Sequence, residues 1–268
     1  MYLEKAKEIL EKEYRQRRAE NTSGFLIEVM DEKICHSYQV LGAGKYLLQN
    51  EECFANCSDA EKDFFQSIVL LHDLGRFYEF LVAGQGIKID HGVYGSEMLA
   101  KIPEFNKTEA ILAVKHHGHL IDKLYEDEEY QKLSENEQEK VRRIAFLVRD
   151  ADKMANLYLL ISRFEEVAPM FFSERHFGNN PNFRTVSEEA WDDFINYRPV
   201  KAKYITTFAE RGLAYLSWVF DLNCRYSFVF LQKTRIVERI TEKFSRYCAK
   251  DDLKKCRKYM EEYIKQKI

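Results

Sequence analysis

Proline and glycine are scarce in this chain of 268 residues, which contains four prolines and 11 glycines. Both residue types interrupt helices, because proline lacks a backbone N–H and glycine loses much conformational freedom on folding. Three of the prolines, Pro169, Pro181 and Pro199, fall in one stretch. The chain is otherwise rich in leucine, glutamate, lysine and arginine, which favour helices. We therefore predict an all-α protein whose residues 165–200 form an irregular loop region.

Long hydrophobic runs are absent as well, because no stretch approaches the ~20 apolar residues that a membrane-spanning helix needs. Residues 1–20 are highly charged and show no apolar segment followed by a small-residue cleavage site, as a secretory signal would. The six cysteines form no CxxC pair, and such thiols are typically reduced in an intracellular protein. We therefore expect a cytoplasmic protein that does not act on a membrane.

An excess of basic residues is also missing, because the formal net charge is −3 and the sequence pI is about 6.2. Proteins that bind nucleic acid polymers usually present a basic field to the phosphate backbone. Polymeric DNA or RNA is therefore not an expected partner of this chain.

Several segments have the apolar spacing of amphipathic helices. Apolar residues recur at helical intervals over 32–49 and over a longer segment from about 136 to 163. Ser58, with Glu61 behind it, can cap a helix that we expect to run to Gly75. These segments support the all-α prediction.

The length is sufficient for one large core with an extension. We expect a helical core at residues 1–165 and a C-terminal helical extension at 166–268 that packs on it. The aromatic-rich stretch from Trp218 to Phe230 fits either an oligomer contact or helical core packing. We expect core packing, with a homo-oligomer as the alternative.

What the chain does contain is a cluster of histidines, because six of the seven lie between residues 36 and 119. Imidazole and carboxylate groups are suitable ligands for Fe, Mn, Zn or Ni. The candidates, in chain order, are His36, His72, Asp73, His91, His116, His117, His119, Asp150 and Asp152. Their joint occurrence in this order indicates a metal site.

Each candidate also has an ordinary explanation when taken alone. His36 could be a core or surface histidine of an amphipathic helix. His116 and its neighbours could complement the dipole at a helix C-terminus. Asp150 and Asp152 could be ion-pair partners of nearby basic residues such as Lys153. The order of the whole set, rather than any single residue, therefore carries the prediction.

The pattern His36…His72-Asp73…Asp152 resembles the H…HD…D signature of the HD superfamily of metal-dependent phosphohydrolases. The local contexts are similar too, and they span roughly residues 32–160. They are CHSYQVLGAGKYL, LLHDLGRF, DHGVYGSEML, AVKHHGH and VRDADKMANL. The HDLGRF and RDADK elements resemble a bacterial subgroup of that superfamily. The resemblance implies an HD-domain helical bundle.

The resemblance also implies a ligand set. It assigns His36, His72, Asp73 and Asp152 to a first ion, and it prefers Asp152 to Asp150 as the final aspartate. His91 and His117 match the additional histidines of members that bind two ions, with Asp73 as the bridge. Alignment of AVKHHGH with the AI-x-x-H element selects His117 over His116. The expected cofactor is one or two divalent transition ions (Fe, Mn, Ni, Co or Zn), with Mg as a further candidate. The sequence departs from the subgroup after Lys153, where Met-Ala-Asn replaces Leu-Asp. Any role of the subgroup's aspartate at that place is therefore in doubt for this chain.

The chemistry implied is hydrolysis of a small phosphorylated metabolite or nucleotide by a metal-bound hydroxide. A metal ion lowers the pKa of bound water and neutralises phosphoryl charge, and we expect Asp73 to orient or deprotonate that water. Arg76 and Lys153 are candidates for binding phosphate oxygens or stabilising the leaving group. Both could instead pair with Asp150 or other acids.

Two other functions use the same residues. Some members of the superfamily are di-iron oxygenases with the same six ligands, and oxygen consumption with iron and a reductant would identify one. A non-catalytic metal- or nucleotide-binding sensor module is the second alternative. The retention of every candidate ligand, together with Arg76 and Lys153, argues against the sensor.

Overall fold

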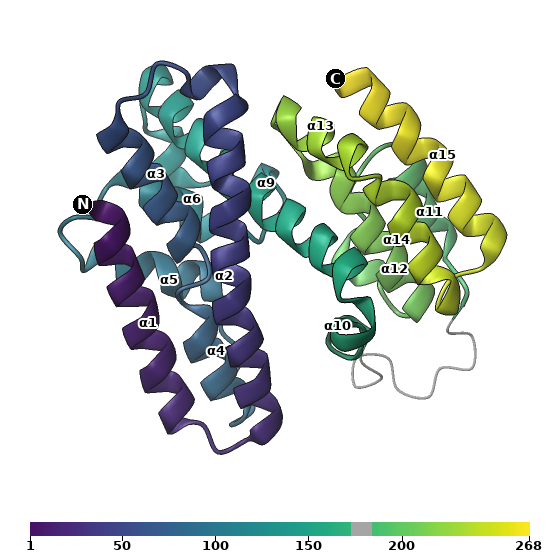
Figure 1. Cartoon of the computed structure of the whole chain (residues 1–268), viewed down its shortest axis with the longest axis horizontal. Coiled ribbons are helices and arrows are strands. Elements are labelled where there is room, and N and C mark those ends of the chain that lie inside the picture. The colour runs from purple at the N-terminus through teal and green to yellow at the C-terminus, as the bar shows by residue number, and fades with distance from the viewer. Residues whose placement is uncertain (173–183) are drawn as a thin grey trace. The chain divides into compact units, whose positions relative to one another are not determined.

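The computed structural model describes residues 1–172 and 184–268, and these residues form helices and connecting turns without a strand. The all-α prediction is therefore confirmed. The chain divides into two compact units, Met1–Asp152 and Lys153–Ile268 (Figure 1). We expected a boundary after residue 165, whereas this division falls inside a helix, before that position.

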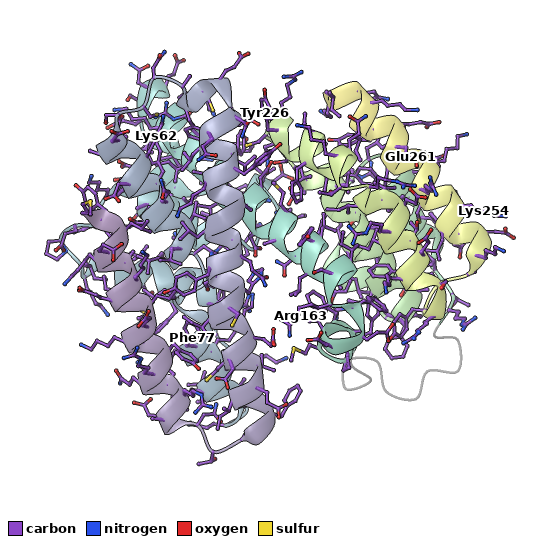
Figure 2. All side chains as sticks on the ribbon, in the orientation of Figure 1. Lys62, Phe77, Arg163, Tyr226, Lys254 and Glu261 are labelled. Carbon is purple, nitrogen blue, oxygen red and sulfur yellow. The ribbon has the colours of Figure 1, made fainter. Side chains whose placement is uncertain are left out.

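The helices of the N-terminal unit precede the long helix α9 (Glu135–Ser162), whose first part belongs to this unit. They are α1 (Tyr2–Glu20), α2 (Gly24–Asn50), α3 (Asp59–Leu71), α4 (Arg76–Ala83), α5 (His91–Ala100), α6 (Thr108–His116), α7 (Asp122–Tyr125) and α8 (Glu128–Gln131), with a 3₁₀ turn η1 (Glu52–Phe54). Helix α3 contacts α1, α2 and α6, and α5 packs along α6 (Figure 1). Phe77 of α4 is fully buried in this unit (Figure 2).

Helix α3 begins as the sequence predicts, because Ser58 and Glu61 form a capping box. Its last four residues, Ile68–Leu71, are fully buried. The helix ends at Leu71 rather than at the predicted Gly75, because His72 takes the C-cap position and Asp73 lies in the turn that follows. Because the helix ends early, the side chains of His72 and Asp73 project from the turn that follows α3 rather than from the helix itself.

The C-terminal unit has its own core. Its helices are the remainder of α9, α10 (Phe164–Phe171), α11 (Glu188–Ile195), α12 (Phe208–Ser217), α13 (Arg225–Lys233), α14 (Ile236–Lys243) and α15 (Lys250–Lys267), with 3₁₀ turns η3 (Ala202–Tyr204), η4 (Trp218–Asp221) and η5 (Phe244–Arg246). Phe220 and Phe228 are buried in this core, and Trp218 and Phe230 pack against it. The aromatic stretch thus packs as a helical core, as expected.

The prediction of an irregular region over 165–200 is wrong for the described residues, because α10 and α11 lie within it. Proline inside α10 removes one helical hydrogen bond, but burial of Phe164 and Val167 outweighs that cost. Ser187 caps α11 by accepting a hydrogen bond from the backbone N–H of Ala190. The turn residues predicted around 178–181 lie outside the described residues.

No helix among residues 1–172 and 184–268 combines the length and the apolar character needed to cross a membrane.

Candidate metal centre

Two helices and one turn of the N-terminal unit bring the first ligand group together. His36 comes from α2, His72 and Asp73 follow α3, and Asp152 comes from α9. His36 Nε2 lies 2.9 Å from Asp152 Oδ1. His72 Nε2 lies 3.4 Å from Asp73 Oδ2 and 3.6 Å from Asp152 Oδ1. The structure therefore places the four residues predicted for the first ion around a common point.

The orientation of His72 suits a metal ligand. Its Nδ1 lies 2.8 Å from the carbonyl oxygen of Val69, one of the carbonyls left open at the end of α3. Nδ1 therefore donates its proton there, and Nε2 faces the carboxylates of Asp73 and Asp152. Nε2 is buried, and among the described residues it has no hydrogen-bond partner. A nitrogen held beside two carboxylates can carry a proton or, in its place, a metal ion.

A second ligand group lies on the other side of Asp73. Its Oδ1 is 3.3 Å from His117 Nε2 and 3.5 Å from His91 Nε2. His117 occupies the C-cap of α6, and its Nδ1 lies 2.7 Å from the carbonyl oxygen of Val114. This repeats the arrangement of His72 at the end of α3. The three residues His36, His72 and Asp73 form one group that could hold a metal ion, and Asp73, His91 and His117 form another.

Two glycines allow these segments to approach one another. A Cβ added to Gly75 would lie 2.3 Å from the backbone oxygen of His91, and one added to Gly92 would lie 2.6 Å from the backbone oxygen of Lys115. The first contact brings the turn after α3 against α5, and the second brings α5 against α6. Only glycine permits both approaches, so Gly75 and Gly92 position His91 within the second group.

The histidines and carboxylates of the first group differ in their protonation states. Burial lowers the pKa of His36 to about 4, with the ammonium of Lys33 acting in the same direction. Burial also disfavours charge on His72, but Asp73 and Asp152 outweigh it and raise the pKa of His72 to about 9. Burial would raise the pKa of both carboxyl groups, yet Lys33 beside Asp73 and His36 beside Asp152 hold them well below the usual range. Both carboxylates are therefore ionised, and a metal ion would displace one proton from His72.

Three charged side chains beside the ligand groups are Lys33, Arg76 and Glu79, and the sequence predicted one of them, Arg76. The ammonium of Lys33 lies 2.7 Å from Asp73 Oδ2. Arg76, which the sequence did suggest, places Nη2 2.7 Å from His91 Nε2 and Nη1 2.6 Å from Glu79 Oε2. Lys33 and Glu79 were missed. The helical spacing of Lys33 and His36 predicts that they share a face of α2, and this signal could have found Lys33.

Other candidate residues have different neighbours. His116 Nε2 lies 2.8 Å from Asp127 Oδ2, so its ring faces away from the atoms of the second group. Asp150 is fully buried and belongs to neither ligand group. Within the C-terminal unit, Lys153 Nζ lies 3.0 Å from Asp221 Oδ2. The roles proposed for these residues remain predictions.

A fully buried arginine supports the loop that carries the second group. Arg149 Nη1 donates to the carbonyl oxygen of His116 at 2.8 Å and to that of His117 at 3.3 Å, and it also reaches that of His119. These carbonyls lie at and just after the end of α6, where the helical hydrogen-bond pattern stops. Arg149 therefore fixes the backbone from which His117 projects, although the sequence suggested only an ion-pair role for its neighbours.

A cavity of about 330 Å³ opens beside the second group. His91 and Arg76 line it together with Lys88, Lys115 and Asp90. The basic side chains of Arg76, Lys88 and Lys115 share this lining with the carboxylates of Glu79 and Asp90, around a space that is small for a polymer. The electrostatic character of this wall suits an anionic ligand.

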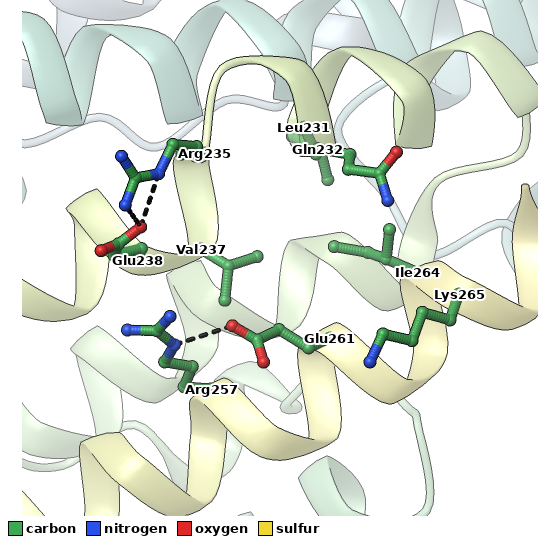
Figure 3. A pocket seen from close by; sticks show the side chains of 9 residues that line it. All are labelled: Leu231, Gln232, Arg235, Val237, Glu238, Arg257, Glu261, Ile264 and Lys265. Atoms are coloured by element: carbon green, nitrogen blue, oxygen red, sulfur yellow. Dashed lines mark hydrogen bonds and ion pairs between the residues drawn. The ribbon is translucent and has the colours of Figure 1, made fainter.

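A second cavity, drawn in Figure 3, lies in the C-terminal unit rather than in the unit that contains both ligand groups. It measures about 210 Å³ and lies among α13, α14 and α15 of the C-terminal unit. Arg235 pairs with Glu238 and Arg257 pairs with Glu261, both within their own segments (Figure 3). Among the described residues, the groups that could hold a metal ion both lie in the N-terminal unit.

A comparison with protein families matches the part of the chain that contains both ligand groups. Residues 34–157 match the family model described as HD domain. This match confirms the resemblance read from the motifs, over nearly the same range. A search of curated proteins and a search of solved structures each gave no match.

Proposed function

We propose, from the premise that residues 34–157 are an HD domain, that this chain is a metal-dependent phosphohydrolase. An HD domain places the chain in a superfamily of metal-dependent hydrolases. The observation that carries the proposal is the position of Asp73 between two ligand groups. Its Oδ2 faces His72, and its Oδ1 faces His91 and His117.

The donor set fits two neighbouring divalent ions that share Asp73. Imidazole nitrogens and carboxylate oxygens are the ligands that Fe, Mn, Co, Ni and Zn accept. Such ions, when bound, lower the pKa of water toward neutrality and neutralise the charge of a phosphoryl group. The His72 and His117 rings are already held in the required orientation by their Nδ1–H bonds.

The side chains of the site have separate tasks in this proposal. Asp73 is a weak base, because its pKa is held well below the usual range once the cations around it outweigh its burial. We therefore assign Asp73 to holding ions and orienting water rather than to accepting a proton. Arg76 lies beside His91 and lines the cavity, where its guanidinium can bind phosphoryl oxygens in a fixed geometry.

The substrate we propose is a small phosphate ester, such as a phosphorylated metabolite or a nucleotide. The cavity of about 330 Å³ supports this size. Lys88 and Lys115 on its wall supply positive charge for an anionic substrate. The acidic net charge of the chain, −3, argues against a nucleic acid polymer.

The test is a phosphatase and nucleotidase screen of metal-stripped protein supplied in turn with Mn, Fe, Co, Ni and Mg. We expect turnover only with a metal, and loss of that turnover in His72→Ala. Full metal binding without turnover of any ester would refute the proposal and favour a sensor. Oxygen consumption with iron and a reductant would refute it in favour of an oxygenase.

A further inference from the structure

Lys33 is a basic residue at the metal centre that the family resemblance did not assign. It lies on α2 one helical turn before His36, so both side chains share a face of that helix. Its Nζ is 2.7 Å from Asp73 Oδ2, and its side chain keeps 23% of its exposure. Among the residues that the structure describes, Asp73 is its ion-pair partner. The ammonium is therefore held at the centre by a side chain that is partly exposed to solvent.

The oxygen that Lys33 contacts is the one that faces the first ligand group. Asp73 Oδ2 also lies 3.4 Å from His72 Nε2. An ammonium and a divalent cation that share one carboxylate oxygen repel each other. The flexible four-carbon stem of lysine allows its charge to move to another acceptor nearby.

The sum of the charges at the site indicates what kind of group Lys33 could contact once a metal ion is bound. The two ligand groups and their neighbours hold three carboxylates, Asp73, Glu79 and Asp152, and two permanent cations, Lys33 and Arg76. These side chains therefore carry one negative charge in excess when the histidines are neutral. One divalent ion reverses this balance to a positive excess, and a second ion increases it. Excess positive charge in a largely buried site favours the entry of an anion.

We propose that Lys33 binds a phosphoryl oxygen of the substrate at the metal centre, in exchange for its contact with Asp73. This rests on the proposed function, because it requires a metal-loaded site and a phosphate group. It adds to Arg76 a second basic group, supplied by α2 rather than by α4. The two cations contact opposite oxygens of Asp73, with Lys33 2.7 Å from Oδ2 and Arg76 Nε 3.5 Å from Oδ1.

The experiment measures binding of Mn²⁺, and then of inorganic phosphate to the Mn-loaded protein, by titration calorimetry. It compares the wild type with Lys33→Gln, Lys33→Arg and a matched control, Lys45→Gln. Lys45 is an exposed lysine of the same helix. A charge-assisted hydrogen bond to phosphate corresponds to about a tenfold change in affinity.

We expect Lys33→Gln to weaken phosphate binding at least about tenfold, with Mn²⁺ affinity unchanged or higher because a neighbouring cation is gone. Lys33→Arg should retain phosphate binding, and Lys45→Gln should match the wild type. Equal phosphate affinity in Lys33→Gln, or no phosphate binding by the Mn-loaded wild type, would overturn the proposal. Weaker Mn²⁺ binding in Lys33→Gln would assign Lys33 to holding Asp73 and would also overturn it.

Failure of the proposed function would look different. In that case phosphate binding would still depend on Lys33, while no phosphate ester in the screen would be hydrolysed.

Discussion

The Nε2 atoms of His91 and His117 lie 3.2 Å apart, and both lie within 3.5 Å of Asp73 Oδ1. His117 donates its Nδ1 proton to Val114, and His91 Nε2 accepts from Arg76. Burial, reinforced by Arg76, lowers the pKa of His91 to about 2, so its ring stays neutral. Two acceptors cannot share a hydrogen bond with each other. A metal ion could bind both nitrogens if the Arg76 guanidinium moved away from His91.

The adjacent histidines 116 and 117 offer a matched test of this second group. His117→Gln should lower the metal content from about two ions per chain to about one, because it removes a ligand of one group only. His116→Gln should keep both ions, because the ring of His116 faces Asp127. Elemental analysis of the two purified variants measures this. Equal metal loss in both variants would contradict the assignment.

Metal binding should release a proton from His72. Its pKa of about 9 in the metal-free protein, where Asp73 and Asp152 outweigh burial, means that it is protonated at neutral pH. A metal ion requires the neutral ring, so affinity should rise about tenfold per pH unit up to pH 9 and level off above it. Calorimetry at pH 7.5 in buffers of different ionisation enthalpy measures this release. Binding without proton release at that pH would disprove the assigned charge state.

Gly92 should be intolerant of a side chain. In Gly92→Ala the added Cβ would lie 2.6 Å from the backbone oxygen of Lys115 and force α5 away from α6. We expect a loss of about 1–3 kcal/mol in unfolding free energy, as in other overpacked sites. Gly42→Ala is the control, because nothing lies within 4 Å of its Cβ and it sits inside helix α2. That control should gain about 0.5–1 kcal/mol, and urea denaturation compares the two. Equal stability of Gly92→Ala and wild type would remove this constraint.

The sequence predicted which side chains would come together, because these candidate ligands occur in short motifs with a fixed order. His36, His72, Asp73 and Asp152 come together as that order implied. The helix beginning after Ser58 was also predictable, because a capping box is a local signal.

What the sequence did not reveal depends on tertiary contacts. Lys33 looks like an ordinary surface lysine until α2 is placed beside Asp73. Arg149 looks like an ion-pair partner until its burial under the end of α6 is known. Helix α10 forms although Pro169 discourages it, because burial of its apolar face outweighs local propensity. Contacts of this kind join residues far apart in the chain, and the local signal for Lys33, its helical spacing from His36, does not identify Asp73 as its partner.

The most direct test of the whole account is the metal content of Asp73→Ala, because this one carboxylate contacts both ligand groups. The control is Asp122→Ala, which removes an exposed carboxylate of α7. Elemental analysis after reconstitution should find about two ions per chain in the wild type and in the control, and almost none in Asp73→Ala. Retention of the full metal content by Asp73→Ala would show that the two groups do not meet at this residue.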